Sequence, residues 1–265
     1  MSKNLVVVKD NKIIQASYKL SLVEQRIILT AIARIDSTKE LNEATGFTVY
    51  VSEIQDLFLD SNTSAYSEIK KATNRLYRRT IILDENGSER RWIYEKRYNR
   101  NEGSVTLFFS PTLIPYLSQL KSSFTKYKLE YIKDFSSAYS IRIYELLVQW
   151  SSKGSREIGI SDLKYMLDLT EKYSRTSNFI ARVIKPSVDD INTHSNLRVS
   201  WGTRKAGKII THIQFKFDLK AAELNQKKRI ATDASKQTLE QYVRDNPVKT
   251  KGKTRDEVYK MMNNK

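Results

Sequence analysis

The stretch Val49-Tyr-Val-Ser-Glu-Ile-Gln-Asp-Leu-Phe58 recurs without gaps as Ile158-Gly-Ile-Ser-Asp-Leu-Lys-Tyr-Met-Leu167. In each copy apolar residues first alternate, which is typical of a short strand with one buried face, and then follow helical spacing. The period changes at a serine followed by an acid, so we expect Ser52 and Ser161 to be helix N-caps. The duplication predicts two structural units of similar fold in one chain.

The elements around the two copies repeat as well. A longer amphipathic helix precedes each copy, and a basic helix and a pair of strands follow it. The predicted ranges are 20–35, 64–79 and 81–110 in the first half, and 137–150, 175–194 and 197–217 in the second. In the second half the two glycines of Gly202–Gly207 suit a hairpin loop. This order predicts an α+β protein with two winged helix-turn-helix domains in tandem and a basic C-terminal tail.

Composition suggests where the domains begin and end. The predicted organisation is an N-terminal winged-helix domain at residues 1–118, a linker at 119–134, a C-terminal winged-helix domain at 135–220 and a basic tail at 221–265. The linker is too apolar to be a floppy connection, so we expect short helices in it. Aromatic residues become rare after Asp218, which predicts a flexible tail with at most one short helix, near residues 235–244.

The charge balance points to a polyanionic partner. Among 265 residues, 46 lysines and arginines face 30 acids, and the excess of +16 divides as +3, +8 and +5 over residues 1–120, 121–220 and 221–265. Neutralising phosphates releases counterions, so nucleic acid is the leading predicted partner, ahead of an acidic membrane surface. The chain has no cysteine and no apolar run of the ~18 residues that a membrane span needs. It is therefore predicted to be cytoplasmic, with no membrane partner.

The outward faces of the two basic helices supply the candidate DNA contacts, because a winged helix lays its third helix in the major groove. Arginine can read guanine there and asparagine adenine, whereas lysine more often holds phosphate. In the first basic helix the outward residues are Ser67, Lys71, Asn74 and Arg78, and we count Arg79 with them. In the second, opposite the stripe of Ile180, Val183, Ile184, Val188 and Ile191, they are Arg175, Asn178, Arg182 and Lys185. We expect Pro186 to kink this helix rather than to begin a new one.

The strand pairs, or wings, offer further cations that could hold the DNA backbone. The second wing is the better candidate, since Arg204, Lys205 and Lys208 lie within or next to its short loop. Trp92 and Trp201 are assigned to the core, because a tryptophan in a strand is more often buried than stacked on a base.

The chain lacks the residues of the common catalytic centres. His194 and His212 are its only histidines and lie apart in the sequence, so we predict no metal site, no cofactor and no enzymatic activity. The absence of a His-hydrophobic-His motif argues against a rolling-circle nickase. The string Gly252-Lys-Thr254 has Pro247 where a phosphate-binding loop needs its first glycine.

Four motifs, in order along roughly residues 1–220, resemble those of the iteron-binding plasmid replication initiator (Rep) proteins. They are Lys19-Leu-Ser-Leu-Val-Glu-Gln-Arg-Ile-Ile-Leu29, the Val-Ser-Glu-Ile block at 51–54, Ile141-Arg-Ile-Tyr-Glu-Leu-Leu147 and Arg182-Val-Ile-Lys-Pro-Ser-Val-Asp-Asp-Ile-Asn192. The resemblance implies that the protein binds repeated origin sequences and opens adjacent AT-rich DNA with the host initiator ATPase and the replicative helicase. It also implies plasmid copy control and a homodimer in equilibrium with the monomer, the dimer repressing its own gene.

The resemblance assigns the stronger sequence-specific contact to the C-terminal domain, and thus the reading role to Arg175, Ser177, Asn178, Arg182 and Lys185. The family's dimer surface belongs largely to the first domain, which leaves Leu5–Val8 and Val105–Phe109 as candidates. Two alternatives stay open. One is a transcriptional repressor that acts on its own operator through the same helices, and the other is the disfavoured nickase.

Overall fold

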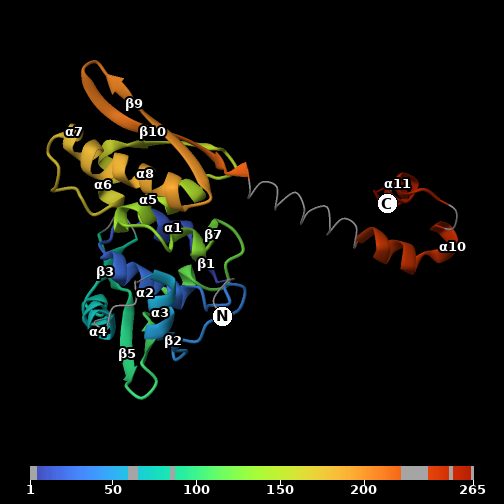
Figure 1. Ribbon diagram of the computed structural model, residues 1–265, viewed down its shortest axis with the longest axis horizontal. Helices are drawn as coiled ribbons and strands as arrows, with labels where there is room; N and C mark the ends of the chain where they lie inside the picture. Colours follow the sequence, from blue (N-terminus) through green and yellow to red (C-terminus); the bar gives the residue numbers. More distant parts are fainter. Residues whose placement is uncertain (1–4, 59–64, 84–86, 222–237, 251–252, 264–265) are drawn as a thin grey trace. The chain divides into compact units, whose positions relative to one another are not determined.

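The computed structural model describes residues 5–58, 65–83, 87–221, 238–250 and 253–263. The chain divides into a first unit, Met1–Asp218, and a second unit, Leu219–Lys265 (Figure 1). Both predicted winged-helix domains lie in the first unit, apart from residues 219 and 220. Their predicted boundaries at residues 118, 134 and 220 stay predictions.

The first unit alternates helices and short strands along the chain. Its first half contains β1 (Val6–Asp10), α1 (Asn11–Gln15), α2 (Leu22–Ile32), β2 (Phe47–Tyr50), α3 (Val51–Phe58), α4 (Ala65–Leu76), β3 (Thr80–Ile82), β4 (Glu89–Arg91), β5 (Ile93–Asn99) and β6 (Ser104–Phe109). Its second half contains the 3-10 helix η1 (Ile114–Tyr116), β7 (Phe124–Lys128), the 3-10 helix η2 (Leu129–Ile132), α5 (Ala138–Val148), β8 (Ser155–Gly159), α6 (Ile160–Met166), α7 (Thr176–Phe179), the π-helix η3 (Ile180–Ile184), α8 (Lys185–His194), β9 (Leu197–Ala206) and β10 (Ile209–Leu219).

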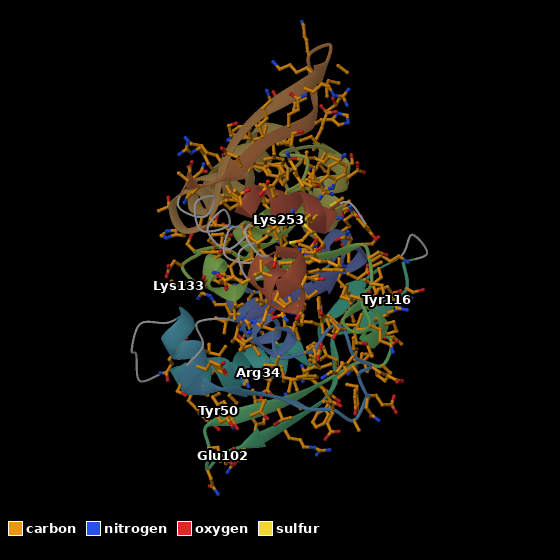
Figure 2. The ribbon with its side chains drawn as sticks, turned by 90° about the vertical axis from the view of Figure 1, so that its right-hand side faces the viewer. Arg34, Tyr50, Glu102, Tyr116, Lys133 and Lys253 are labelled. Carbon is orange, nitrogen blue, oxygen red and sulfur yellow. The ribbon has the colours of Figure 1, made fainter. Side chains whose placement is uncertain are left out.

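The internal repeat is confirmed by the topology of the two three-stranded sheets. Their strand orders are β2-β6-β5 and β8-β10-β9. In both, the short strand before the helix pair lies antiparallel to the last strand of the wing, with Phe47 opposite Leu107 and Ile158 opposite Ile213. The predicted tandem of two winged helices is therefore the fold of this unit. Two views, turned by 90°, show the β9–β10 hairpin projecting from it (Figures 1 and 2).

The helices that follow the repeated strands begin earlier than expected. α3 begins at Val51 and α6 at Ile160, each directly after its strand. The N-cap of α6 is Gly159, without a side-chain hydrogen bond, and a Cβ added there would lie 2.7 Å from Oδ2 of Asp162. The prediction that Ser52 and Ser161 are N-caps is therefore wrong, because no residue separates strand from helix.

The predicted linker, residues 119–134, contains a strand and one 3-10 helix, η2, rather than short helices alone. β7 pairs antiparallel with β1, from Val6 opposite Lys128 to Asp10 opposite Phe124. The 3-10 helices η1 and η2 lie on either side of β7 in the chain. The strand escaped prediction because its only partner among the described residues lies more than a hundred residues away, so no local turn signal marks it.

The two candidate dimer surfaces are engaged within the chain to different degrees. Val7 is fully buried, and β6 is the central strand of its sheet, with Leu107 and Phe109 also buried. Val6 of β1 is 38% exposed, so a dimer could still form through Leu5–Val8, whereas one through β6 would have to displace its sheet partners; both surfaces stay predictions. Trp92 is buried as expected, with its ring edge-on to Tyr18 at 4.9 Å between centroids.

The second unit is more helical than predicted. Residues 238–245, α10 (Pro247–Thr250) and α11 (Arg255–Asn263) are helical, and Leu239 and Val258 are buried. The expectation of at most one short helix is therefore wrong, although residues 235–237 of the predicted range lie outside the described residues. No helix in the described part of the chain has the length and apolar character that a membrane span requires.

Candidate nucleic-acid interface

The second basic helix is a continuous helical segment made of α7, η3 and α8. Its five predicted reading residues are all exposed, and they are Arg175, Ser177, Asn178, Arg182 and Lys185. Its inner face is apolar, with Phe179, Val183, Ile184, Val188 and Ile191 buried. Ile180, which we expected in the buried stripe, is only half-buried, and Phe179 takes its place.

The turn before Pro186 widens instead of ending the helix. The backbone N–H of Lys185 donates to the carbonyl of Ile180, five residues back, which is the π-helical pattern. Proline lacks an N–H and its ring clashes with the carbonyl four residues back, and a widened turn relieves both problems. Where a kink at Pro186 was predicted, the helix thus has a π turn, and Arg182 is exposed on that turn.

Packing beneath this helix fixes its first turn. The ring of Phe179 is fully buried and lies 6.2 Å from that of Tyr173, between centroids. Nζ of Lys164, on α6, donates to the carbonyl of Tyr173 at 2.7 Å and lies over the Phe179 ring. At the other end, the side chain of Asn192 exchanges two hydrogen bonds with the backbone of Val199 at 2.7 and 2.8 Å. The exposed cations therefore stand on an anchored scaffold.

The second wing is longer, and its loop shorter, than predicted. β9 continues to Ala206 and β10 begins at Ile209, so Arg204 and Lys205 lie on a strand and only Gly207 and Lys208 form the turn. Gly207 has φ +60°, the left-handed conformation that a Gly-first two-residue hairpin turn requires. The predicted loop Gly202–Gly207 is wrong for this reason.

Arg204 is engaged within the sheet. Its Nη2 lies 3.0 Å from Oε1 of Glu157 on β8 and also contacts the ring of His212. Hydrogen bonds from Gln214 and Arg204 lower the pKa of Glu157. Lys205 and Lys208 are exposed nearer the tip. Of the three predicted wing cations, the two lysines are thus better placed to meet a phosphate.

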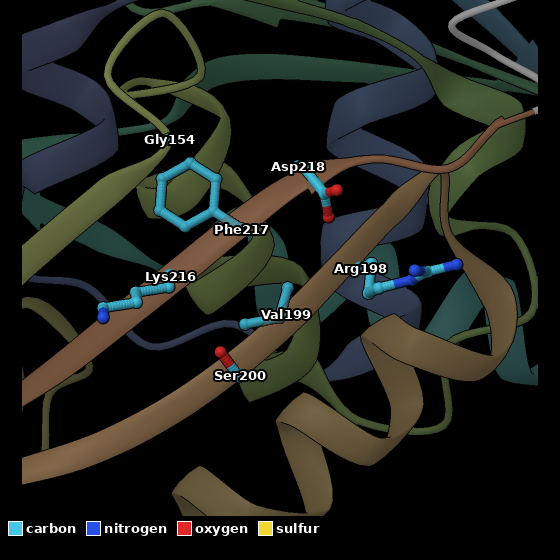
Figure 3. A pocket seen from close by; sticks show the side chains of 7 residues that line it. All are labelled: Gly154, Arg198, Val199, Ser200, Lys216, Phe217 and Asp218. Atoms are coloured by element: carbon cyan, nitrogen blue, oxygen red, sulfur yellow. The ribbon is translucent and has the colours of Figure 1, made fainter.

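A hollow of about 310 Å³ lies on the sheet at the other end of the hairpin (Figure 3). Residues of both charges line it, Arg198 and Lys216 as well as Asp218. The mixed charge weakens its attraction for a phosphate. The cationic character of this wing is therefore concentrated near its tip.

The first basic helix is α4, which presents Lys71, Asn74 and Arg78 at exposed positions, Arg78 just past its end. Asn74 has partners already, because its Oδ1 accepts hydrogen bonds from Nζ of Lys96 and from the hydroxyl of Tyr98. The wing strand β5, which carries Lys96 and Tyr98, thus lies against this face of α4. Lys71 and Arg78 remain the better-placed candidates of this helix.

Arg79 has a structural role that the sequence did not reveal. Glu24 of α2 is fully buried, and its carboxylate accepts from Nε of Arg75 at 2.9 Å and Nε of Arg79 at 3.1 Å. It also accepts from the backbone N–H of Ser21 at 2.8 Å, completing a capping box. Burial alone would raise the pKa of Glu24, but these hydrogen bonds outweigh burial and lower it. Arg79 therefore joins α4 to α2.

Replacing Arg79 with alanine should lower the free energy of unfolding by ~1–3 kcal/mol, because a buried carboxylate loses one charged hydrogen-bond partner. DNA affinity at a fixed salt concentration should hardly change. Urea denaturation followed by circular dichroism measures the first effect and fluorescence anisotropy the second. Lys71→Ala is the control and should show the reverse, with stability kept and affinity reduced. A DNA-binding loss in Arg79→Ala equal to that in Lys71→Ala would restore Arg79 to the interface.

Sequence reasoning missed an aromatic-cation cluster beside α4. Nζ of Lys96 lies 5.2 Å from the ring centroid of Tyr77 and 5.5 Å from that of Tyr98. The guanidinium of Arg91 also lies over the Tyr77 ring, with Cζ 5.5 Å from its centroid. Burial, followed by the nearby charge of Arg78, lowers the pKa of Lys96. The alternation of tyrosine and cations along β5 was the available signal, because strand residues two apart share a face.

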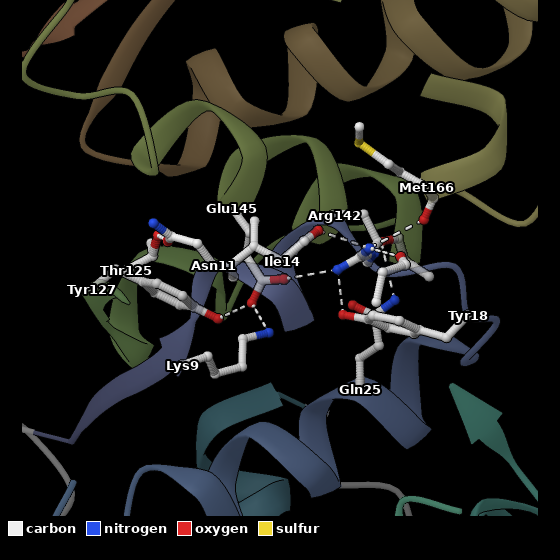
Figure 4. A network of polar contacts seen from close by, with 12 residues as sticks. Lys9, Asn11, Ile14, Tyr18, Gln25, Thr125, Tyr127, Arg142, Glu145 and Met166 are labelled. Atoms are coloured by element: carbon white, nitrogen blue, oxygen red, sulfur yellow. Dashed lines mark hydrogen bonds and ion pairs between the residues drawn. The ribbon is translucent and has the colours of Figure 1, made fainter. Parts of the chain in front are cut away.

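A buried polar network joins the two halves of the first unit (Figure 4). Glu145 of α5 is fully buried and accepts from Nζ of Lys9 and from the hydroxyl of Tyr127, both at 2.6 Å. Arg142, one turn earlier, donates to the carbonyls of Ile14 at 3.0 Å and Met166 at 3.1 Å. The N-terminal segment and α6 are thereby tied to α5.

A second set of contacts lies alongside. Arg26 of α2 donates to the carbonyls of Lys133 at 3.0 Å and Phe135 at 2.9 Å. Asp190 of α8 is buried and accepts a hydrogen bond from the backbone N–H of Ser136 at 2.9 Å. These bonds hold the segment before α5 between α2 and α8.

The two basic helices lie toward the same side of this unit. In Figure 1, α4 of the first and α7 of the second are both on the left.

Two winged helices in tandem, each with an exposed basic helix, place the protein in the class of tandem winged-helix proteins. The chain belongs to the replication initiator protein family: residues 6–148 match the family described as Initiator Replication protein, WH1, and residues 159–217 match Initiator Rep protein, WH2. The family and the fold predicted from the sequence are thus confirmed. Within the described residues no group of three or more histidine, aspartate or glutamate side chains could hold a metal ion.

Individual relatives agree with this assignment. A replication initiation protein of Escherichia coli is 33% identical over 207 residues, which are 74% of this chain and 64% of that protein. The PI protein of Escherichia coli is 24% identical over 240 residues, covering 75% of this chain and 78% of that protein. The crystal structure of the Pi initiator protein in complex with iteron DNA has a TM-score of 0.72 at 21% identity, covering 83% of this chain and all of that one. The structural likeness shows a shared fold.

Proposed function

We propose that this protein initiates plasmid replication by binding repeated double-stranded DNA sites, iterons, at the origin. The observation that carries the proposal is the second basic helix, where Arg175, Asn178, Arg182 and Lys185 are exposed above a buried apolar face. Family membership and the iteron complex of the Pi initiator support the same function. Arginine and asparagine on such a helix can read base edges in the major groove.

The charge distribution favours contact at the N-terminal half of this helix. Asp189, one turn beyond Lys185, is exposed and would repel a phosphate. From Ile191 to Phe217 the chain has no acidic residue, so the exposed Lys205 and Lys208 of the second wing are available to the DNA backbone. The helix is thus proposed to read bases while the wing holds phosphates.

Later steps belong to the same proposal. We propose that the bound protein promotes opening of the origin and recruits the host initiator ATPase and the replicative helicase, acting in the cytoplasm by binding and without a cofactor. A homodimer in equilibrium with the monomer would control copy number. The replication initiation protein of Escherichia coli, of which this chain spans 64%, supports a role in initiation.

Footprinting of the purified protein on its own plasmid tests the proposal directly. At 150 mM salt we expect protection of several repeated sites next to an AT-rich segment, with repeats bound more tightly than random DNA of equal length. Protection of a single inverted repeat at the promoter, with no activity when the protein is supplied in trans to an origin plasmid, would instead identify a repressor. Equal binding to random DNA would overturn the proposal.

Lys205→Ala should weaken all DNA sequences to a similar degree and lower the slope of log affinity against log salt by about one. The reason is that Lys205 is exposed on the wing, where it can neutralise a phosphate without reading a base. Fluorescence anisotropy titrations between 50 and 200 mM salt, roughly the range over which such slopes are resolved, measure both effects. Arg204→Ala is the matched control, with a smaller change in slope because Glu157 already pairs with Arg204. If Lys205→Ala lost affinity for some DNA sequences but not for others, contact of Lys205 with the DNA backbone would be contradicted.

A further inference from the structure

Ile209 stands out among the exposed apolar residues of the described chain. Its side chain is 71% exposed, whereas the next most exposed large apolar residue, Trp150, is 41% exposed. It follows the two-residue turn directly, since it is the first residue of β10. A large β-branched side chain is therefore held in solvent at the tip of the second wing.

The tip extends beyond the sheet that supports it. β8 pairs only with residues His212–Lys216 of β10, so from Thr211 to the turn the hairpin has two strands. Figures 1 and 2 show this end of the hairpin projecting from the unit. Ile209 can thus enter a narrow groove without a clash from the rest of the domain.

The chemistry around Ile209 favours DNA over a protein partner. Lys208 immediately precedes it and Lys205 is on the facing strand near the same tip, both exposed, and no acidic residue occurs between Ile191 and Phe217. Two cations and one apolar side chain at the same tip suit a groove lined by phosphates on both edges. A stable protein interface buries roughly 1,200–2,000 Å², far more than one isoleucine can offer.

We infer that Ile209 is a wedge that enters the minor groove beside the site read by the second basic helix and partly unstacks one base step. The inference rests on the proposed function. Minor-groove proteins insert apolar side chains of this kind between base pairs, and the kink that results bends the duplex toward the major groove. Lys205 and Lys208 would neutralise the phosphates on either side of the widened groove. Ile209 would then favour flexible pyrimidine–purine steps, which adds specificity without a hydrogen bond to a base.

The test uses the full-length protein and duplexes of the footprinted site in which 2-aminopurine replaces one adenine at a time. The fluorescence of 2-aminopurine rises when its stacking is lost. Wild-type protein should give a rise at one position flanking the major-groove site, and Ile209→Ala should abolish the rise. Affinity should fall by about three- to tenfold, because the truncated side chain buries less apolar surface. Because Ile209 is exposed, its truncation leaves the fold intact.

Two control variants separate the wedge from simple charge. Ile209→Met keeps an apolar side chain of similar reach and should keep the fluorescence rise. Lys208→Ala should also keep it while lowering the salt slope by about one. If the wild-type protein protects the origin but produces no rise at any position, or if Ile209→Ala produces the same rise, the wedge is overturned and the proposed function stands. If the wild-type protein protects no origin sequence, both are overturned.

Discussion

Glu145→Ala should lower the free energy of unfolding by about 3–5 kcal/mol, the largest loss of stability we expect from one substitution. The carboxylate of Glu145 is fully buried and accepts from Lys9 and Tyr127 at 2.6 Å and from Arg142 at 3.4 Å. Its removal leaves two cations in the interior without their counter-charge. Burial already lowers the pKa of Lys9, and the charge of Glu145 opposes that shift. Urea denaturation followed by circular dichroism measures the loss.

The control for this prediction is an ion pair that solvent surrounds. Lys39 and Asp36 pair at 3.1 Å, but their side chains are 77% and 50% exposed. Lys39→Ala should leave stability nearly unchanged, because water screens exposed pairs. A Glu145→Ala protein that unfolds at the same urea concentration as Lys39→Ala would show that the cluster contributes no net stability. Glu145→Gln should fall between the two, since it keeps a hydrogen-bond acceptor but loses the charge.

The fold was accessible from sequence wherever the deciding signal was local. The change of period at residues 49–58 and 158–167 predicted the repeat, and both sheets show it. The helices predicted at residues 20–35 and 137–150 are present as α2 and α5, which begin after the capping residues Ser21 and Ser137. Strand β7 depended on a partner more than a hundred residues away, and no window of sequence contains that contact.

The candidate site was only partly accessible, for a related reason. Helical periodicity places a residue on the side away from the core, and it did so correctly for Arg182 and Lys185. It does not say what else packs on that side. Asn74 is hydrogen-bonded to Lys96 of the wing strand β5. Arg79 lies past the end of α4, where helical spacing no longer applies, and it pairs with the buried Glu24. Excess positive charge also misleads, because Lys9, Arg26 and Arg142 are buried inside the protein.

Arg182→Ala should weaken binding to the footprinted site by about 1–3 kcal/mol and relax the preference at one base pair. Arg182 is exposed on the π turn, while Val183 and Ile184 beside it are buried, so its guanidinium points away from the core. A guanidinium in the major groove can donate to both acceptors of a guanine, and no other side chain does so with the same geometry. Dissociation constants for the site and for each of its single base-pair variants, at one salt concentration, measure both effects.

The matched control is Arg182→Lys, which keeps the charge and loses the planar pair of donors. It should lose most of the preference at that base pair while keeping the salt slope of the wild-type protein. Arg182→Ala should behave like the lysine variant in specificity and differ from it only in overall affinity. If Arg182→Ala weakened every sequence alike and Arg182→Lys restored wild-type binding, Arg182 would hold a phosphate, and base reading would fall to Arg175 and Asn178 at the start of the same helix.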